Sequence, residues 1–228
     1  MSAYIAKLET FFGEFQAFRA GARARRLARI GDFLCTFEEV QRRAVGSGLA
    51  DFNVFSLLGI ETDEVRHTRV LAWLLDARAE HGAGNVFLKT LVDLCGLGLP
   101  VEVLEQYKVR REFWVAESRV DVAVYRWGEF VIYLENKVYA AEGPAQVERE
   151  FGDMNRWGEA LRVTEGRRFG IFLTPEGREP RSGDARAWRA VSYEEVARRF
   201  EELVVRVKTE KGRLLLRDWI EVALRLGR

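Results

Sequence analysis

Apolar residues recur at helical spacing through the N-terminal part of the chain and change to strand-like runs after Pro100. Residues 2–18 and 24–45 each favour a helix, and residues 55–98 favour two more. The first of these later helices is expected to be capped by Thr62, because a threonine hydroxyl accepts well from the first backbone N–H groups of a helix. The chain is therefore expected to begin with helices.

After these helices, runs rich in Val, Tyr, Phe and Trp indicate strands, with amphipathic helices between and after them. The predicted strands are residues 105–116, 118–126, 129–138, 167–177 and 188–193. The predicted helices are residues 146–161, between the third and fourth strands, and residues 192–207 and 212–226, after the fifth. This order favours an α/β fold with one central mixed sheet flanked by helices. We expect residues 51–228 to form that domain, and residues 1–50 to form an N-terminal helical extension.

Polar residues interrupt the most apolar of these strands, "VIYLENKVYA", at Glu135, Asn136 and Lys137. Residues two apart on a strand share a face, so Glu135 and Lys137 are expected to point one way and Asn136 the other. Asp121 interrupts the preceding strand, "RVDVAV", in the same manner. Buried ionised carboxylates need compensation. Either Lys137 and nearby arginines form an ion-pair network, or both carboxylates hold a divalent metal ion; these residues alone leave both explanations open.

Asp121 and Glu135 can serve one site only if they lie on the same face of the antiparallel strand pair. Directly opposed residues share a face. A two- or four-residue loop centred on Trp127 and Gly128 would instead place Asp121 opposite Leu134. We therefore predict a three-residue connection, or a bulge that corrects the register.

The bulk composition is that of an ordinary globular protein: 48% of the 228 residues are hydrophobic, 31% are charged, and the formal net charge is +1. No uncharged apolar run approaches the roughly 20 residues needed to span a bilayer, and the N-terminus lacks the features of a signal peptide. We therefore expect a cytoplasmic protein with no membrane partner. Cys35 and Cys95 form no CxxC pair and are expected to be buried reduced thiols, while the spacing of His67 and His81 matches no zinc motif.

Basic residues gather in two places, between the first two predicted helices and on the first two predicted strands. A net charge near zero does not exclude a polyanionic partner, because a basic face can be local. Each group is either a solvated face or a phosphate-contacting surface, and the sequence leaves this open. The candidate nucleic-acid contacts are Arg19, Arg23, Arg25, Arg26, Lys108, Arg110 and Arg119.

Asp121 followed by Glu135-x-Lys137 resembles the motif of the PD-(D/E)XK nuclease superfamily, in which such residues on two neighbouring strands form a magnesium-dependent phosphodiesterase site. Further blocks extend the resemblance over roughly residues 53–193, in the order found in one bacterial branch of that superfamily. These blocks are "NVFSLLGIETDEVRHTRVLAWLLD", "HGAGNVFL", "SRVDVAV", "YLENKVYAAEGPAQVE" and "FLTPEG".

The resemblance implies a restriction-endonuclease-like fold and a metal-dependent nuclease that acts on DNA, with Mg²⁺ as cofactor and Mn²⁺ able to substitute. It makes Asp121 and Glu135 metal ligands, Lys137 the catalytic lysine, and Glu64 a helix residue that helps to hold the metal. Gln146 matches the glutamine of the helix beside the site and joins the catalytic set. By analogy it suggests a role in phage defence or mobile-element biology, with a homodimer or a partner subunit as the working assembly.

The sequence departs from the branch pattern at three positions. Thr68 stands where serine is usual, Ser118 replaces the glycine of Gly-Arg-x-Asp, and Glu150 stands where some relatives carry tyrosine. Two other classes of function stay open: a catalytically inactive nucleic-acid- or protein-binding module that retains the fold, and a structural subunit whose acidic cluster is only an ion-pair network.

Overall fold

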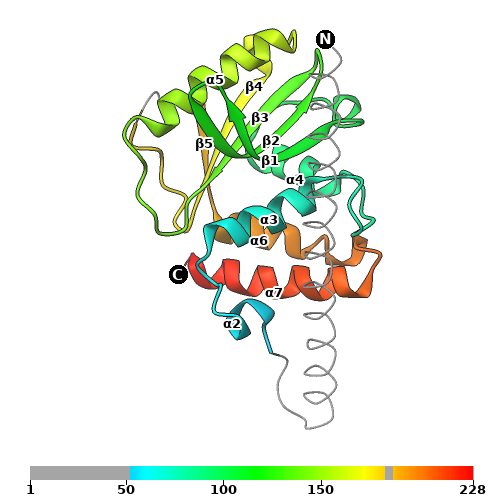
Figure 1. Ribbon diagram of the computed structural model, residues 1–228. Helices are drawn as coiled ribbons and strands as arrows, with labels where there is room; N and C mark the ends of the chain where they lie inside the picture. Colours follow the sequence, from blue (N-terminus) through cyan, green and yellow to red (C-terminus); the bar gives the residue numbers. More distant parts are fainter. Residues whose placement is uncertain (1–51, 183–186, 228) are drawn as a thin grey trace, which may run out of the picture. The chain divides into compact units, whose positions relative to one another are not determined.

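The structure is a computed structural model that describes residues 52–182 and 187–227 (Figure 1). The predicted helical extension over residues 1–50 lies outside the described residues. Cys35 and the candidate contacts Arg19, Arg23, Arg25 and Arg26 lie outside them as well.

A five-stranded mixed sheet forms the centre of the described part, with its strands in sequence order. Neighbouring strands among the first three pair in antiparallel fashion, and neighbouring strands among the last three pair in parallel fashion. The strands are β1 (Lys108–Val115), β2 (Ser118–Arg126), β3 (Phe130–Asn136), β4 (Arg168–Thr174) and β5 (Trp188–Ser192). The predicted α/β class with a central mixed sheet is confirmed.

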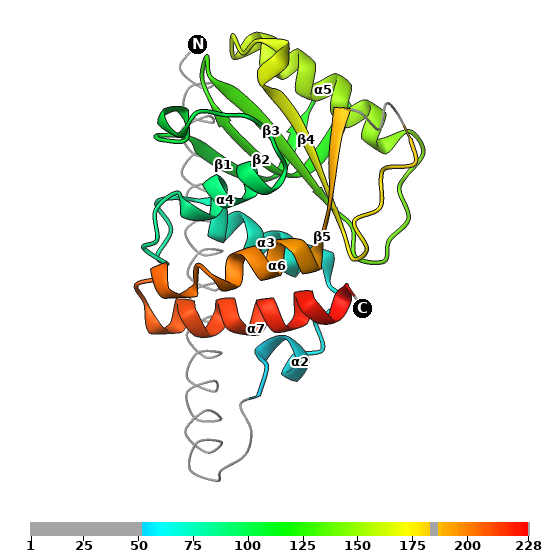
Figure 2. The same ribbon diagram turned by 180° about the vertical axis from the view of Figure 1, so that it is seen from behind.

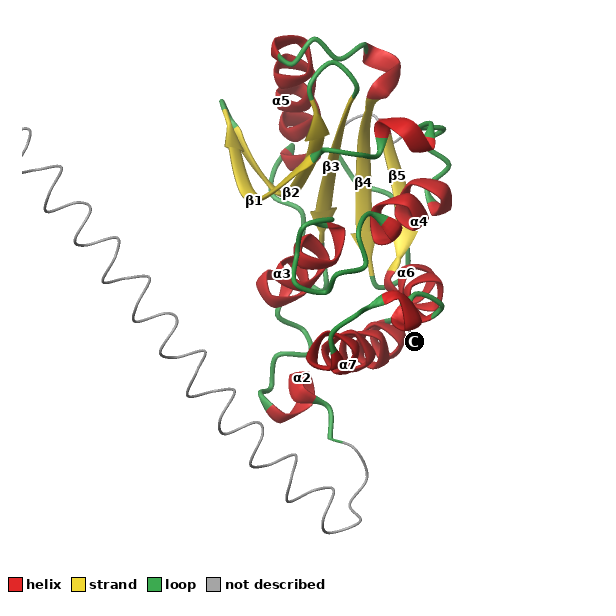
Figure 3. Cartoon of the chain, turned by 90° about the vertical axis from the view of Figure 1, so that its right-hand side faces the viewer, coloured by secondary structure: helices red, strands yellow, loops and turns green. Residues whose placement is uncertain are grey.

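Helices cover both faces of this sheet. In Figure 3, α5 lies on one side of the sheet and α4 and α6 on the other, and Figure 2 shows α6 between the sheet and α7. The α-helices of the described residues are α2 (Val54–Leu57), α3 (Glu64–Leu75), α4 (Val86–Leu94), α5 (Gln146–Ala160), α6 (Tyr193–Glu201) and α7 (Glu210–Leu226), and short 3₁₀ helices span Val101–Val103, Glu165–Arg167 and Val204–Arg206.

Alternation along β3 divides the core between the two faces. Val131 and Tyr133 pack against Val147 and Met154 of α5. Asn136, at the end of the strand, points to the opposite face. It is fully buried, and its side-chain amide donates to Thr68 of α3. The side chains of one strand thus reach two different helices, as the period of two requires.

A three-residue connection, Trp127 to Glu129, joins β2 to β3, as predicted. Gly128 has a φ of 70°, a left-handed conformation that glycine adopts without strain. Arg126 pairs with Phe130, and the same register continues to the pair Val122–Leu134. The next positions along this register bring Asp121 opposite Glu135.

The start of α3 differs from the prediction by one residue. Asp63, not Thr62, is the N-cap, and its Oδ1 accepts a hydrogen bond of 3.1 Å from the backbone N–H of Arg66. Aspartate and threonine are both good caps, so the pattern alone does not separate neighbouring candidates. The shift places Glu64 at the first helical position, where the helix dipole favours an acid.

Two further expectations concern membranes and thiols. No helix within residues 52–182 and 187–227 is long and apolar enough to cross a membrane. Cys95 is a free, buried cysteine, and burial raises the pKa of its thiol to about 12.

The packing of Gly170 in β4 leads to a first prediction. A Cβ atom at this position would lie 2.5 Å from Cδ2 of Trp188, in the buried layer under α5. We expect Gly170→Ala to lower the free energy of unfolding by about 1–3 kcal/mol, because a rigid ring would have to move. Urea denaturation measures this as a lower midpoint at an unchanged slope.

Gly166→Ala is the matched control, since a Cβ there meets no atom within 4 Å. Its expected effect is within about 0.5 kcal/mol. Equal stability of the two variants would contradict the packing of Trp188 over β4.

Candidate active site

Asp121, Glu135 and Lys137 converge at the end of the hairpin formed by β2 and β3. Lys137 follows β3 directly, and its backbone N–H donates to the carbonyl of Leu173 at 2.9 Å, which continues the pairing with β4. Its Nζ lies 2.8 Å from Oε1 of Glu135, and both side chains are largely buried. The two residues therefore share a face, as the strand period predicts.

Only part of the carboxylate charge is compensated. Oδ2 of Asp121 accepts a hydrogen bond of 2.9 Å from the backbone N–H of Asn136, and Oε1 of Glu135 is paired with Lys137. Oε2 of Glu135 is buried and has no hydrogen-bond partner among the described residues. An orphaned carboxylate oxygen is costly, so the ion pair with Lys137 alone does not satisfy this cluster.

Burial and mutual repulsion raise the pKa values of these acids. Burial, followed by the nearby charge of Glu135, raises the pKa of Asp121 to about 7. Burial, followed by the charge of Glu150, raises the pKa of Glu135 to about 7. Burial would lower the pKa of Lys137, but the neighbouring Glu135 outweighs it and raises that pKa above its ordinary value. Lys137 is therefore a cation at neutral pH.

Gln146, the first residue of α5, connects Glu135 to a further buried acid, Glu150. Its Nε2 donates to Oε1 of Glu135 at 2.6 Å and to Oε1 of Glu150 at 2.8 Å, while its Oε1 accepts from the N–H of Gly143. Glu150 is 1% exposed, and its Oε2 also has no hydrogen-bond partner in the described part of the chain. Burial raises the pKa of Glu150 to about 7.

Glu150 is the site residue whose role the sequence did not reveal. Its position was noted only because tyrosine occurs there in some relatives. The available signal was its spacing of four from Gln146, which places both side chains on one face of a helix. That face becomes part of the site only because α5 packs against β3.

Glu64 and Asn136 attach the site to α3. Oε1 of Glu64 accepts from the backbone N–H groups of Val138 (2.8 Å) and Ala140 (3.1 Å), which fixes the segment after Lys137. Nδ2 of Asn136 donates to the carbonyl of Glu64 and to Oγ1 of Thr68. The hydroxyl that threonine shares with serine is thus the group in use at position 68.

Ser118 makes use of the side chain that glycine would lack. Its hydroxyl and backbone N–H both donate to Oδ2 of the buried Asp153 in α5, at 2.6 and 2.7 Å. The N–H of Glu117 donates to the same oxygen at 3.0 Å. The turn before β2 is therefore held by Asp153, and a serine at this position fits it.

A divalent cation suits these donors. Asp121 and Glu135 present hard carboxylate oxygens, of the type that Mg²⁺ prefers, and Oε2 of Glu135 lacks a partner in the described part. The described residues contain no cluster of three or more acidic, histidine or cysteine side chains arranged to hold a metal by themselves. A magnesium ion bound by one or two carboxylates, with waters and substrate phosphate completing the shell, has no need of such a cluster.

The two histidines are structural. His67 Nε2 is 2.7 Å from the carbonyl of Glu61, and Nδ1 accepts from the indole N–H of Trp219. His81 lies between the rings of Trp73 and Phe87. Burial lowers the pKa of both imidazoles.

The described candidate nucleic-acid contacts lie on exposed parts of β1 and β2. Lys108 and Arg110 are exposed on β1, which pairs only with β2 within the described sheet. Arg119 on β2 is also exposed, lies 4.0 Å from Glu112 and stacks over Trp114. None of these three residues belongs to the hydrogen-bonded network of Glu135 and Gln146.

Two acids on neighbouring strands, with a lysine two residues after the second, fit the motif of the PD-(D/E)XK nuclease superfamily. A family model described as the PD-(D/E)XK nuclease superfamily matches residues 52–221 of the chain. The protein belongs to this superfamily. Comparisons with curated proteins and with solved structures found no match.

The raised pKa values lead to a prediction about stability and pH. Asp121, Glu135 and Glu150 titrate near 7 in the folded chain, against ordinary values of 3.8, 4.5 and 4.5. The folded chain thus keeps protons that the unfolded chain has released, so stability is lost as the pH rises through 7. His67 and His81 act in the opposite direction below 6.5, so the effect is cleanest above that pH.

In EDTA, the thermal unfolding midpoint is expected to fall between about pH 6.5 and pH 8. Mg²⁺ should raise the midpoint more at pH 8 than at pH 6.5, because a cation competes with these protons. Differential scanning calorimetry at the two pH values measures both effects. A midpoint that rises with pH in EDTA would contradict the assignment, and Asp121→Asn should weaken the response to Mg²⁺.

Proposed function

We propose that this protein is a metal-dependent nuclease that hydrolyses the phosphodiester bonds of DNA, with Mg²⁺ as its cofactor and Mn²⁺ able to replace it. The observation that carries the proposal is the convergence of three side chains at the end of the β2–β3 hairpin: Asp121 accepts from the backbone N–H of Asn136 at 2.9 Å, next to Glu135, and Lys137 lies 2.8 Å from Glu135. Nuclease chemistry follows from the superfamily, and the metal, the DNA substrate and the residue roles are our proposals.

Asp121 and Glu135 would hold the cation. When bound, it supplies a Lewis acid for the scissile phosphate and lowers the pKa of a coordinated water. The two carboxyls must lose their protons to bind it, and the ion pair with Lys137 favours the ionised form of Glu135.

Lys137 acts as a cation in this mechanism. Its ammonium group would serve as a hydrogen-bond donor, as it does toward Glu135. Placed beside Glu135, its ammonium group would stabilise the negative charge that develops on the phosphate oxygens as water attacks phosphorus. It could also orient that water.

Gln146 and Glu64 are positioning residues in this scheme. Gln146 fixes one oxygen of Glu135 at 2.6 Å, and Glu64 fixes the backbone that follows Lys137. We propose that Glu64 also helps to hold the metal through a water.

Exposed basic residues would hold the DNA backbone. Lys108, Arg110 and Arg119 are suited to phosphate contacts that carry little sequence information. The proposed setting is the bacterial cytoplasm, in phage defence or mobile-element biology, and a homodimer or a partner protein is the proposed assembly. The second candidate function, a catalytically inactive binding module, is separated from the first by turnover.

The first test of the nuclease proposal is cleavage of plasmid and linear DNA with Mg²⁺ or Mn²⁺, beside an EDTA control. We expect cleavage that requires the metal, and Lys137→Ala should lower its rate about 10²–10³-fold, as the loss of one preorganised charge-stabilising donor does. Asp121→Asn should abolish cleavage by removing a ligand.

Lys89→Ala on α4 is the matched control and should cut at the normal rate. Cleavage that persists in EDTA, or that survives Lys137→Ala unchanged, would disprove this mechanism. A folded chain that binds Mg²⁺ and DNA without cutting would favour the inactive binding module.

The second test uses Glu150, whose charge raises the pKa of Glu135. Glu150→Gln keeps the size of the side chain and removes the charge, so the pKa of Glu135 should fall. The acidic limb of the pH profile of cleavage should then move to lower pH, which initial rates between pH 5 and pH 8 would measure.

Glu148→Gln, an exposed acid on the same helix, is the control and should leave the profile in place. An unmoved profile in Glu150→Gln, with cleavage intact, would show that Glu150 does not act on Glu135.

A further inference from the structure

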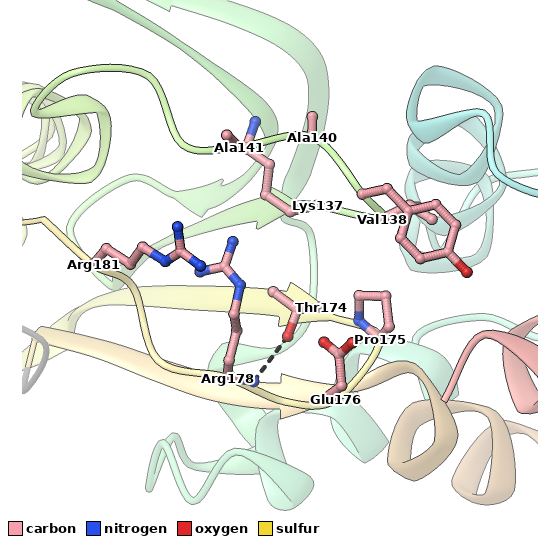
Figure 4. A pocket seen from close by; sticks show the side chains of 10 residues that line it. Lys137, Val138, Ala140, Ala141, Thr174, Pro175, Glu176, Arg178 and Arg181 are labelled. Carbon is pink, nitrogen blue, oxygen red and sulfur yellow. Dashed lines mark hydrogen bonds between the residues drawn. The ribbon is translucent and has the colours of Figure 1, made fainter. Parts of the chain in front are cut away.

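A cavity of about 550 Å³ opens beside Lys137, and the proposed mechanism does not use it. One wall is the segment after β3 and the other is the segment after β4, and Figure 4 shows side chains from both segments around the opening. Its lining consists of Lys137, Val138, Tyr139, Ala140, Ala141, Thr174, Pro175, Glu176, Arg178 and Arg181.

Carboxylates fix both walls. Glu64 accepts from the backbone N–H groups of Val138 and Ala140 in the first wall. The side chain of Glu142 is 4% exposed, lies 2.6 Å from Nη1 of Arg178 in the second wall, and accepts from the backbone N–H of Arg181. The opening therefore has a defined shape, held by groups on α3 and on the loop before α5.

The lining combines cations with an exposed aromatic ring. Glu142 forms an ion pair with the side chain of Arg178. Its bonds to Arg181 come from the backbone N–H, so the guanidinium group of Arg181 is not part of that ion pair. Tyr139 is 70% exposed and lines the cavity, so its ring is accessible to a ligand. A cation for a phosphate and a ring for a base together suit a nucleotide.

The one acid among the ten lining residues is also consistent with a nucleotide. Glu176 is exposed and repels phosphate, but a carboxylate accepts a hydrogen bond from the amino group of cytosine, and the amino group of adenine is a donor of the same kind. The size of the cavity falls within the range of roughly 300–1,000 Å³ typical of small-molecule pockets. The cavity is of a size for a single nucleotide.

We propose that this cavity binds one unpaired nucleotide of the substrate strand, next to the scissile bond, with its base stacked on Tyr139 and its phosphate on Arg181. Lys137 lines the cavity and also touches Glu135, so the bound nucleotide is adjacent to the reacting phosphate. The inference rests on the proposed nuclease function and specifies its substrate: a strand that is single at the site of cleavage.

Binding of a short fluorescent oligo-dA by the full-length chain tests this, in EDTA so that cleavage does not consume the probe. Fluorescence anisotropy should show that Tyr139→Ala weakens binding by roughly tenfold, in line with the loss of one base–aromatic stack. Arg181→Ala should reduce the slope of log Kd against log salt by about 0.7, the value for one phosphate contact on a single strand.

Matched controls exclude general effects of losing a ring or a charge. Trp127→Ala removes an exposed ring from the far end of β3, and Arg199→Ala removes an exposed charge from α6. Both should bind the oligonucleotide as the wild type does. A blunt linear duplex, in which every base is paired, should bind to Tyr139→Ala and to the wild type equally.

Each outcome decides between the two proposals. Oligonucleotide binding that is unchanged in Tyr139→Ala and Arg181→Ala would overturn the nucleotide pocket, even if the protein cleaves DNA. An equal loss of duplex and oligonucleotide binding in Tyr139→Ala would also overturn it, because the ring would then contact paired DNA. Tyr139-dependent binding without any metal-dependent cleavage would support the pocket and disprove the nuclease.

Discussion

The opposition of two buried carboxylates across β2 and β3 is the constraint on which the rest of the site depends. Asp121 and Glu135 lie on one face because Trp127, Gly128 and Glu129 form a three-residue connection. A register shifted by one residue would send one acid to the opposite face, against α3. The hairpin register is therefore a functional feature as well as a structural one.

The two helices beside this pair, α5 and α3, contribute different contacts to the site. On the α5 side, Gln146 donates to Glu135 and also brings in the buried Glu150, which adds like charge. On the α3 side, the side chain of Glu64 accepts from two backbone N–H groups and orders the segment after Lys137. The result is a polar centre with cationic and anionic groups in contact and two carboxylate oxygens left without partners in the described part. A divalent cation would satisfy such a centre.

The same segment after β3 links chemistry with substrate binding. Lys137 contacts Glu135, and the four residues that follow it form a wall of the cavity that contains Arg181. Glu142, in the next position, is bonded to the segment after β4. Residues 137–142 thus connect the reacting centre to the proposed nucleotide pocket through a few hydrogen bonds, so substitutions in this loop should affect binding and catalysis together.

The sequence by itself determined the class of the fold, the succession of strands and helices along the chain and the acidic pair, because a period of two and apolar strand composition are local signals. It also predicted that a three-residue connection, or a bulge in its place, would let Asp121 face Glu135. It misplaced the cap of α3 by one residue, because Thr62 and Asp63 are both suitable caps. Only the tertiary structure decided that Glu150 enters the site and that Tyr139 and Arg181 line one cavity. Those contacts join segments whose spacing along the chain carries no periodic signal, and packing of α5 and of the loop after β4 against β3 brings them together.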